Sequence, residues 1–151
     1  MAVRSVKHLS LVFLLFFMGS RRQVVVVYVR YAGKLLLVKR SFFVRSFRQR
    51  WSIVSGRIED HESDALMTAF RELEEEVGLL PDQVRLVKRG VPFEAKMSDK
   101  NRFVHPFLFD ALTDKISLNW ENSDFAWVSP EELVNFKLVE GVDYLLQDLL
   151  G

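Results

Sequence analysis

The stretch from Gly56 to Leu79 reads GRIEDHESDALMTAFRELEEEVGL and contains the most ordered pattern in the chain. Its apolar residues recur at the spacing of one helical face, at Leu66, Ala69, Phe70, Leu73 and Val77. Gly78 fits the position just past a helix end, and Pro81 prevents the helix from continuing. The pattern therefore predicts one amphipathic helix that ends at Gly78.

Three carboxylates of this helix are predicted to share one face. Glu72, Glu75 and Glu76 stand at i, i+3 and i+4, about 130° away from the apolar stripe on an ideal helix. Such carboxylates repel one another, and the helix dipole disfavours anions in the C-terminal half of a helix. A hard divalent cation such as Mg²⁺, which prefers oxygen ligands, explains the arrangement. A solvated charged face is the alternative that the helix alone leaves open.

The sequence on both sides of this helix predicts a series of strands. Gln23–Val29 is apolar on both alternating faces, as expected of a strand covered on both sides. The predicted strands are Gln23–Val29, Leu35–Val38, Trp51–Val54, Val84–Arg89, Arg102–Asp110, Ile116–Leu118 and Phe125–Val128, with loops at Ser41–Arg50 and Glu94–Asn101.

Two further helices are predicted near the C-terminus. Ser129–Glu132 (SPEE) combines an N-cap serine, a proline at the first helical position and a glutamate that completes a capping box. Val142–Leu150 is amphipathic. Strands mixed with two or three helices predict an α/β fold in which helices cover both sides of a mixed sheet.

The composition fits one globular domain and excludes several classes of protein. The chain has 151 residues, which is the length of a single domain. Its 21 Lys and Arg residues against 20 Asp and Glu residues leave a net charge of +1, without the strongly basic field of a general nucleic-acid binder. Cysteine is absent, which excludes disulfides, thiolate metal sites and cysteine nucleophiles.

The first 20 residues differ from the rest of the chain. An apolar run, Leu9–Met18, is shorter than the roughly 20 residues that a membrane-spanning helix needs. Three interpretations are open: a misassigned translation start, with the true start at Met18; a hydrophobic tail or anchor; and a cleaved signal. We therefore separate a hydrophobic N-terminal segment, residues 1–20, from a domain at residues 21–151.

The ordered stretch resembles the signature of the Nudix family of hydrolases. That signature is Gly, five residues, Glu, seven residues, and then Arg-Glu-apolar-x-Glu-Glu-x-Gly-apolar. Arg71–Leu79 (RELEEEVGL) matches the second half at every specified position, and Gly56 and Glu62 match the first half. The one departure is that eight residues, not seven, separate Glu62 from Arg71. Ser63–Asp64, before the helix, is where a loop can absorb the extra residue.

This resemblance, which covers roughly residues 22–150, implies a Nudix-type α/β/α sandwich with a mixed β-sheet between helices. It also implies a metal centre that uses Mg²⁺ or Mn²⁺, whose ligands are Glu72, Glu75, Glu76 and the backbone carbonyl of Ser55. Arg71 would hold Glu62 or another carboxylate of the motif in place. The structural positions of the motif are Gly56, Glu62, Arg71 and Gly78.

Several residues outside the motif are candidates for chemistry or for substrate binding. Glu121 stands where family members often supply an extra carboxylate, so it is a candidate metal ligand or general base, with a surface role as the alternative. Guanidinium groups fit phosphate oxygens, so an arginine-rich loop is a candidate phosphate contact, with a solvated loop as the alternative. Trp51 is a candidate for base stacking, although an isolated aromatic is more often part of a core. The loop arginines are Arg45, Arg48 and Arg50.

The resemblance implies metal-dependent hydrolysis of a pyrophosphate bond in a nucleoside di- or triphosphate derivative, which releases a nucleoside monophosphate. Glu76 or Glu121 would help to deprotonate the attacking water, with Glu72 and Glu75 completing the catalytic carboxylates. The alternative is a nucleotide-sensing Nudix domain without activity, although such domains usually lose motif carboxylates. The expected partner is a small nucleotide rather than a nucleic acid, in the cytoplasm, with no membrane unless residues 1–20 form an anchor. Homodimers are frequent in the family.

Overall fold

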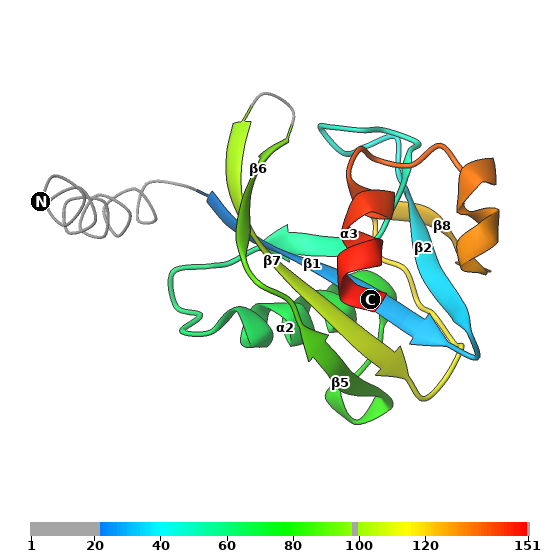
Figure 1. Cartoon of the computed structure of the whole chain (residues 1–151), viewed down its shortest axis with the longest axis horizontal. Helices are drawn as coiled ribbons and strands as arrows, with labels where there is room; N and C mark the ends of the chain where they lie inside the picture. The colour runs from blue at the N-terminus through cyan, green and yellow to red at the C-terminus, as the bar shows by residue number, and fades with distance from the viewer. Residues whose placement is uncertain (1–21, 98–99, 151) are drawn as a thin grey trace, which may run out of the picture.

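The computed structural model describes residues 22–97 and 100–150 (Figure 1). The segment 1–20 lies outside these residues, so its three interpretations stay predictions. In the part of the chain that the structure describes, no helix is long and apolar enough to cross a membrane.

The fold is built on one mixed sheet with β1 (Arg22–Tyr31) at its centre. β1 pairs in parallel with β7 (Lys100–Ala111) and antiparallel with β2 (Lys34–Arg40) and β4 (Val54–Arg57). The outer strands all pair antiparallel: β3 and β8 with β2, and β5 and β6 with β7. Their bounds are β3 Trp51–Ser52, β5 Val84–Arg89, β6 Phe93–Met97 and β8 Asn122–Val128.

Helices cover both faces of the sheet, which confirms the predicted α/β class and layering (Figure 1). α2 (Ala65–Val77) packs against the alternate β1 residues Val25, Val27 and Val29. α3 (Val142–Leu150) packs against the opposite face, which carries Val26 and Tyr28. The buried Tyr28 hydroxyl donates a hydrogen bond to the Val142 carbonyl at the start of α3. β1 therefore contributes to both cores, as its two-sided apolar pattern predicts.

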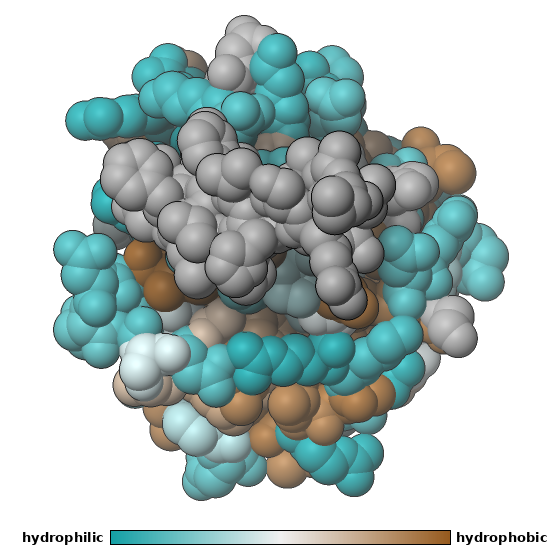
Figure 2. All heavy atoms as spheres, turned by 60° about the vertical axis from the view of Figure 1, so that its left-hand side comes forward, coloured by the Kyte–Doolittle hydropathy of each residue, from teal (hydrophilic) through white to brown (hydrophobic). Residues whose placement is uncertain are grey.

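The end of the sheet where β1 begins faces the viewer in Figure 2. Hydrophilic residues ring most of its visible surface, and hydrophobic atoms gather in the lower part. This end of the sheet holds the first residues of β1 and β7, Arg22 and Lys100.

The sequence prediction was wrong for two segments and incomplete for two others. The predicted loop Glu94–Asn101 contains most of β6, because Phe93 and Ala95 pack on the core and every residue of Phe93–Met97 pairs with β7. The predicted strand Ile116–Leu118 is not a strand: Ser117 N–H donates to the Val77 carbonyl at the end of α2, at 2.9 Å. The helix predicted from Ser129 is a short 3₁₀ helix, η2 (Pro130–Asn135), and Trp51–Val54 is divided between β3 and β4. A second 3₁₀ helix, η1, spans Pro81–Gln83.

Both ends of α2 are capped by residues that the sequence supplies. At the start, the Asp64 side chain accepts a hydrogen bond from the Leu66 N–H, at 3.1 Å. At the end, Gly78 adopts a left-handed conformation with φ of 71°, and its N–H donates to the Glu74 carbonyl. A Cβ atom at Gly78 would stand 2.9 Å from the Ser117 Cβ, so both the backbone conformation and the close packing favour glycine there.

We expect Gly78→Ala to destabilise the fold more than Gly33→Ala. Gly33, in the turn between β1 and β2, also has positive φ, but nothing lies within 4 Å of a Cβ added there. Gly33→Ala should therefore cost only the conformational strain, about 1–2 kcal/mol, while Gly78→Ala adds the overlap with Ser117, at least about 1 kcal/mol more. Urea unfolding followed by circular dichroism measures both. Equal losses would mean that the Ser117 segment moves freely.

Candidate active site

The motif carboxylates lie where α2 crosses β4. Gly56 of β4 sits directly beneath Glu72: a Cβ atom at Gly56 would stand 2.0 Å from the Glu72 carboxylate. Any side chain at Gly56 would displace that carboxylate, so the glycine sets how closely helix and strand approach. The helix face that carries the glutamates therefore packs directly on the backbone of β4.

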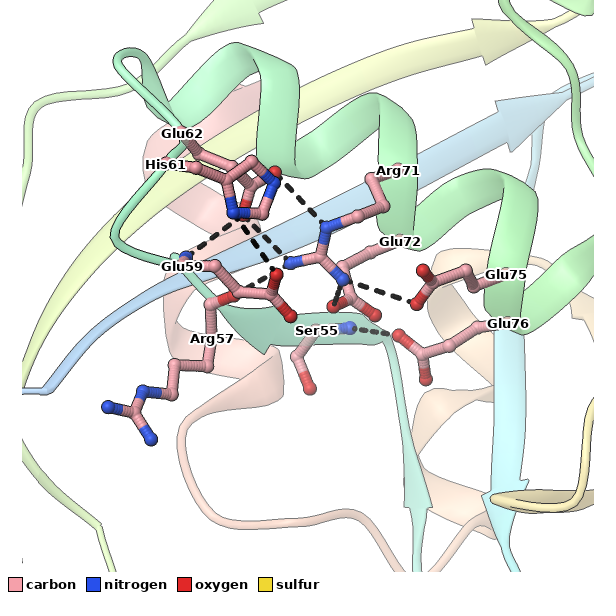
Figure 3. A network of polar contacts seen from close by, with 9 residues as sticks. All are labelled: Ser55, Arg57, Glu59, His61, Glu62, Arg71, Glu72, Glu75 and Glu76. Atoms are coloured by element: carbon pink, nitrogen blue, oxygen red, sulfur yellow. Dashed lines mark hydrogen bonds and ion pairs between the residues drawn. The ribbon is translucent and has the colours of Figure 1, made fainter.

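Arg71 connects the motif into one polar network (Figure 3). Its guanidinium donates two hydrogen bonds to Glu62, at 3.1 and 3.0 Å, in a bidentate arrangement. It also donates to Glu72 at 2.8 Å, to Glu75 at 3.2 Å and to the Arg57 carbonyl at 2.8 Å. One side chain thus ties α2 to β4 and to the loop between them.

The extra residue between Glu62 and Arg71 does not keep the two apart. Ser63 and Asp64 precede the first residue of α2, so a residue added there would lengthen the loop and not the helix. Glu62 is buried, and it also accepts a hydrogen bond from the Glu59 N–H at 2.9 Å. The hydrogen bonds from Arg71, with a smaller contribution from the Glu59 N–H, lower the pKa of Glu62 to about 2.

Glu76 is the most deeply buried of the motif carboxylates, with 3% of its surface exposed. It accepts hydrogen bonds from the Ser55 N–H at 3.1 Å and from the Asn122 side chain at 3.2 Å. Burial raises its pKa well above the ordinary value, and the charges of Glu72 and Glu121 raise it further. Burial also raises the pKa of Glu72 to about 7, although Glu76 and Arg71 lower it in part. Neighbouring protein groups therefore neutralise this pair of carboxylates only incompletely.

The backbone of Ser55 faces the same carboxylates. Ser55 is the register partner of Val26 on β1, yet its N–H donates to Glu76 rather than into the ladder. In an antiparallel pair, the N–H and C=O of one residue point to the same side of the strand. The Ser55 carbonyl therefore also points away from β1, toward the side on which Glu76 lies.

Glu121 and Arg40 join the cluster from the other side. The charge of Glu121 raises the pKa of both Glu72 and Glu76, so all three carboxylates lie near one another. The Glu121 carbonyl accepts a hydrogen bond from the Ser41 N–H at 2.8 Å, which places the end of β2 beside it. Arg40 is half-buried there: burial lowers its pKa, and the charges of Glu76 and Glu121 raise it in part. Arg40 and Asn122 carried no sequence signal, because only the fold brings them to Glu76.

The donor set fits a hard divalent cation in its chemistry. All the side-chain donors are carboxylate oxygens, which Mg²⁺ and Mn²⁺ prefer, and Glu72 and Glu76 form a buried pair that a cation would neutralise. Among residues 22–97 and 100–150, no three Asp, Glu or His side chains converge tightly enough to hold an ion without rearrangement. In this arrangement Arg71 occupies oxygens of Glu72 and Glu75.

The loop arginines and Trp51 lie outside this cluster. Arg45 and Arg50 are exposed, and Arg48 donates to the Val44 carbonyl at 2.7 Å. Trp51 packs edge-on against Phe136, with 5.1 Å between ring centres. None of the four lines either of the two cavities that adjoin Ser55 in the described structure, so their substrate contacts stay predictions.

Two cavities meet at Ser55 on the sheet face opposite α2. The larger, about 600 Å³, lies between β6 and α3, and its walls are mainly apolar; they include Tyr28, Ile53, Phe93 and Val142. The smaller, about 250 Å³, includes Arg40, Arg57 and Gly56 in its walls. The two cavities share Val26, Ser52, Ser55 and Val139. Ser55, whose N–H donates to Glu76, therefore lines both an apolar cavity and a basic cavity.

We expect Glu62→Gln to cost stability only where Glu62 is ionised. A carboxyl group whose folded pKa lies below its unfolded value stabilises the fold above the unfolded pKa, and the gain disappears as the pH falls toward the folded value. For Glu62 that window runs from the ordinary 4.5 down to about 2. At pH 6 the variant should lose about 2 to 3 kcal/mol of unfolding free energy, and the loss should shrink steadily below pH 4.5.

Urea unfolding at several pH values measures this difference, and Glu74→Gln is the matched control. Glu74 is an exposed carboxylate on the same helix, so its replacement should cost little at each pH. A loss that is the same at pH 6 and pH 2.5 would contradict the ionic role of Glu62.

Known proteins with similar sequences are consistent with the resemblance of the motif. The RNA pyrophosphohydrolase of Hydrogenovibrio crunogenus is 30% identical over 142 residues, which cover 79% of this chain and 82% of that protein. Nudix hydrolase 22, chloroplastic, of Arabidopsis thaliana is 29% identical over 68% of this chain. The chain spans 41% of that protein and 28% of Nudix hydrolase 15, mitochondrial, of the same plant, so it corresponds to less than half of either.

Solved structures show the same fold. A Caenorhabditis elegans Ap4A hydrolase in a binary complex superposes with a TM-score of 0.68 at 20% identity, covering 84% of this chain and 93% of that one. The NUDIX domain of Shewanella oneidensis NrtR, complexed with ADP ribose, gives 0.70 at 16% identity and covers 85% of each chain. The family model described as the NUDIX domain matches residues 19–149, and the chain therefore belongs to the Nudix hydrolase family.

Proposed function

We propose that the chain hydrolyses a pyrophosphate bond in a nucleoside di- or triphosphate derivative, with a divalent metal ion, and releases a nucleoside monophosphate. The observation that carries the proposal is the buried pair Glu72 and Glu76, which faces Ser55 and whose charge Arg71 neutralises only in part. Burying two like charges side by side is costly, so the arrangement has no structural benefit of its own. It is useful if a cation binds there.

The residues that would hold Mg²⁺ or Mn²⁺ are Glu72, Glu75, Glu76 and the carbonyl of Ser55. Glu75 is the most exposed of the three side chains, at 54%, so it can turn from Arg71 toward an ion at little cost. When bound, such an ion neutralises phosphate oxygens and lowers the pKa of water. Arg71 would keep Glu62 and Glu72 in position while Glu75 exchanges partners.

The chain's own groups would supply proton transfer and binding. Glu76 or Glu121 would accept the proton of the water that attacks phosphorus. Glu76 has a raised pKa and accepts a hydrogen bond from Ser55, and the charges of both glutamates act on Arg40. Arg40 would offset negative charge on the phosphate. The apolar cavity of about 600 Å³ has the size of a small-ligand site and would hold the nucleoside.

A nucleotide-sensing domain without activity is the alternative that we favour less. Loss of motif carboxylates is typical of such domains, and Glu72, Glu75 and Glu76 are all present here. The network around Arg71 is also complete despite the extra residue in the loop after Glu62. Both observations support a hydrolase.

We expect Glu76→Gln to lower turnover by at least about 100-fold while the fold is kept. Glutamine can still accept from Ser55 and removes a buried charge, so the midpoint of thermal unfolding should stay the same or rise. Glu74→Gln, on the exposed face of α2, is the matched control and should keep normal turnover. Release of a nucleoside monophosphate, followed by chromatography, measures the rates. Turnover by Glu76→Gln within about threefold of the unmodified chain would contradict the assignment.

We also expect the activity to require a metal ion, and a panel of candidate substrates would identify the substrate class. The panel would contain nucleoside triphosphates, oxidised triphosphates, ADP-ribose, nucleotide sugars, Ap4A and a 5′-triphosphorylated RNA. The last two are included because an Ap4A hydrolase and an RNA pyrophosphohydrolase are among the similar proteins. Each would be run with Mg²⁺ and with EDTA. Nucleotide binding without turnover on every member would favour the sensing alternative.

A further inference from the structure

Three arginines from three strands lie on one face at one end of the sheet. Arg22 on β1 is the register partner of Arg102 on β7, and Arg57 on β4 is the partner of Val24, two residues further along β1. Residues paired across strands share a face, and residues two apart in a strand share it as well. Arg22, Arg57 and Arg102 are therefore on the face that carries Val24, Val26 and Ser55, opposite α2.

These arginines also line a common cavity. All three contribute to the walls of the 250 Å³ cavity, together with Ser55, Gly56 and Arg40. Figure 3 shows the Arg57 side chain extending away from the carboxylate network, on the side to which the Ser55 side chain also points. The cavity thus extends from Ser55, whose N–H donates to Glu76, along β4 to the three guanidinium groups.

The arginines have no carboxylate partner to balance their charge within residues 22–97 and 100–150. Among the described residues, Arg102 donates to the backbone carbonyl of Asn101, and its pKa is lowered by burial and then by the charges of Arg22 and Arg57. Elsewhere in the sheet, arginines are neutralised: Arg30 and Arg85 both bind Asp110.

Such a group of like charges is unfavourable unless an anion binds among them. Like charges on paired residues destabilise a sheet, and none of the ion pairs among the described residues includes these three arginines. A phosphate provides the missing charge, and guanidinium forks match its oxygens in geometry. A phosphate is also the group that the neighbouring centre is proposed to handle.

We propose that Arg22, Arg57 and Arg102 bind the non-scissile phosphates of a substrate with three or more linked phosphates. This rests on the proposed function, because it places the scissile bond at Glu72, Glu76 and Ser55. Along an extended strand of about 3.4 Å per residue, Arg57 follows Ser55 by about 7 Å, within reach of a phosphate chain that starts there. Substrates with a triphosphate are therefore favoured over diphosphate-linked ones such as ADP-ribose.

The direction of the cavities supports this order of groups. The apolar cavity and the arginine cavity share Ser55 and extend from it along different elements, toward α3 and along β4. If the nucleoside occupies the apolar cavity, its phosphate chain would pass Ser55 and enter the arginine cavity. A diphosphate bridging two apolar or neutral groups would leave the three arginines without a phosphate.

The test measures binding of inorganic tripolyphosphate and of pyrophosphate by calorimetry, in EDTA and again with Mg²⁺. The variant is Arg22→Gln, Arg57→Gln and Arg102→Gln combined, and the control is Arg85→Gln, which removes one exposed guanidinium near the opposite end of β1. The unmodified chain should bind tripolyphosphate at least about tenfold more tightly than pyrophosphate. The combined variant should lose that difference, and the control should keep it.

A Kd for tripolyphosphate within about twofold between the unmodified chain and the combined variant, in both conditions, would overturn the proposal. Thermal unfolding checks the fold, and removing repelling charges should leave the midpoint equal or higher; if the combined variant fails to fold, Arg57→Gln and Arg102→Gln are measured singly. Tripolyphosphate binding that depends on the arginines, with no turnover of any nucleotide, would support the anion site while rejecting the proposed hydrolysis. Displacement by ATP or by a 5′-triphosphorylated RNA then identifies the source of the triphosphate.

Discussion

The hydrogen bonds of Arg71 are the constraint on which the site depends. Its guanidinium reaches Glu62 in the loop before α2, Glu72 and Glu75 on the helix, and the carbonyl of Arg57 on β4. The contact between α2 and β4 is therefore fixed by one planar group with several donors, which a flexible lysine ammonium would not reproduce. Gly56 completes the contact, because only hydrogen fits between the strand and the Glu72 carboxylate.

The same contact buries charges that the fold itself would not select. Glu72 and Glu76 lie close together in an environment that raises the pKa of both, chiefly through burial. On the opposite face of the sheet, guanidinium groups crowd together instead. Each group is unfavourable alone, and a metal ion with a phosphate chain would neutralise both together. Under the proposed function, the two unfavourable clusters would be parts of a single binding site.

How far the sequence predicts this arrangement depends on how far apart in the sequence the contacting residues are. The stripe Leu66–Val77 and the capping glycine are local signals, so α2 and its carboxylate face were predictable from spacing alone. Ile116–Leu118 looked like a strand because it alternates apolar residues, but the N–H of its central residue, Ser117, bonds to the Val77 carbonyl at the end of α2 instead. Arg40 and Asn122 reach Glu76 only through the pairing of β2 with β8 and the loop before it, which no local pattern reveals.

The arginine group illustrates the same limit more sharply. The alternation of β1 places Arg22 on the face of Val24 and Val26, and that much follows from the sequence. Its meeting with Arg102 depends on a parallel pairing between segments about 80 residues apart, and a shift of one residue would send the two guanidinium groups to opposite faces. The pairing of β1 with β7 from Val24 opposite Val104 to Val29 opposite Phe109, which is apolar at every position except His105, holds that register. The hydrophobic core therefore decides where the charges meet and, under the proposal, which anions the site would hold.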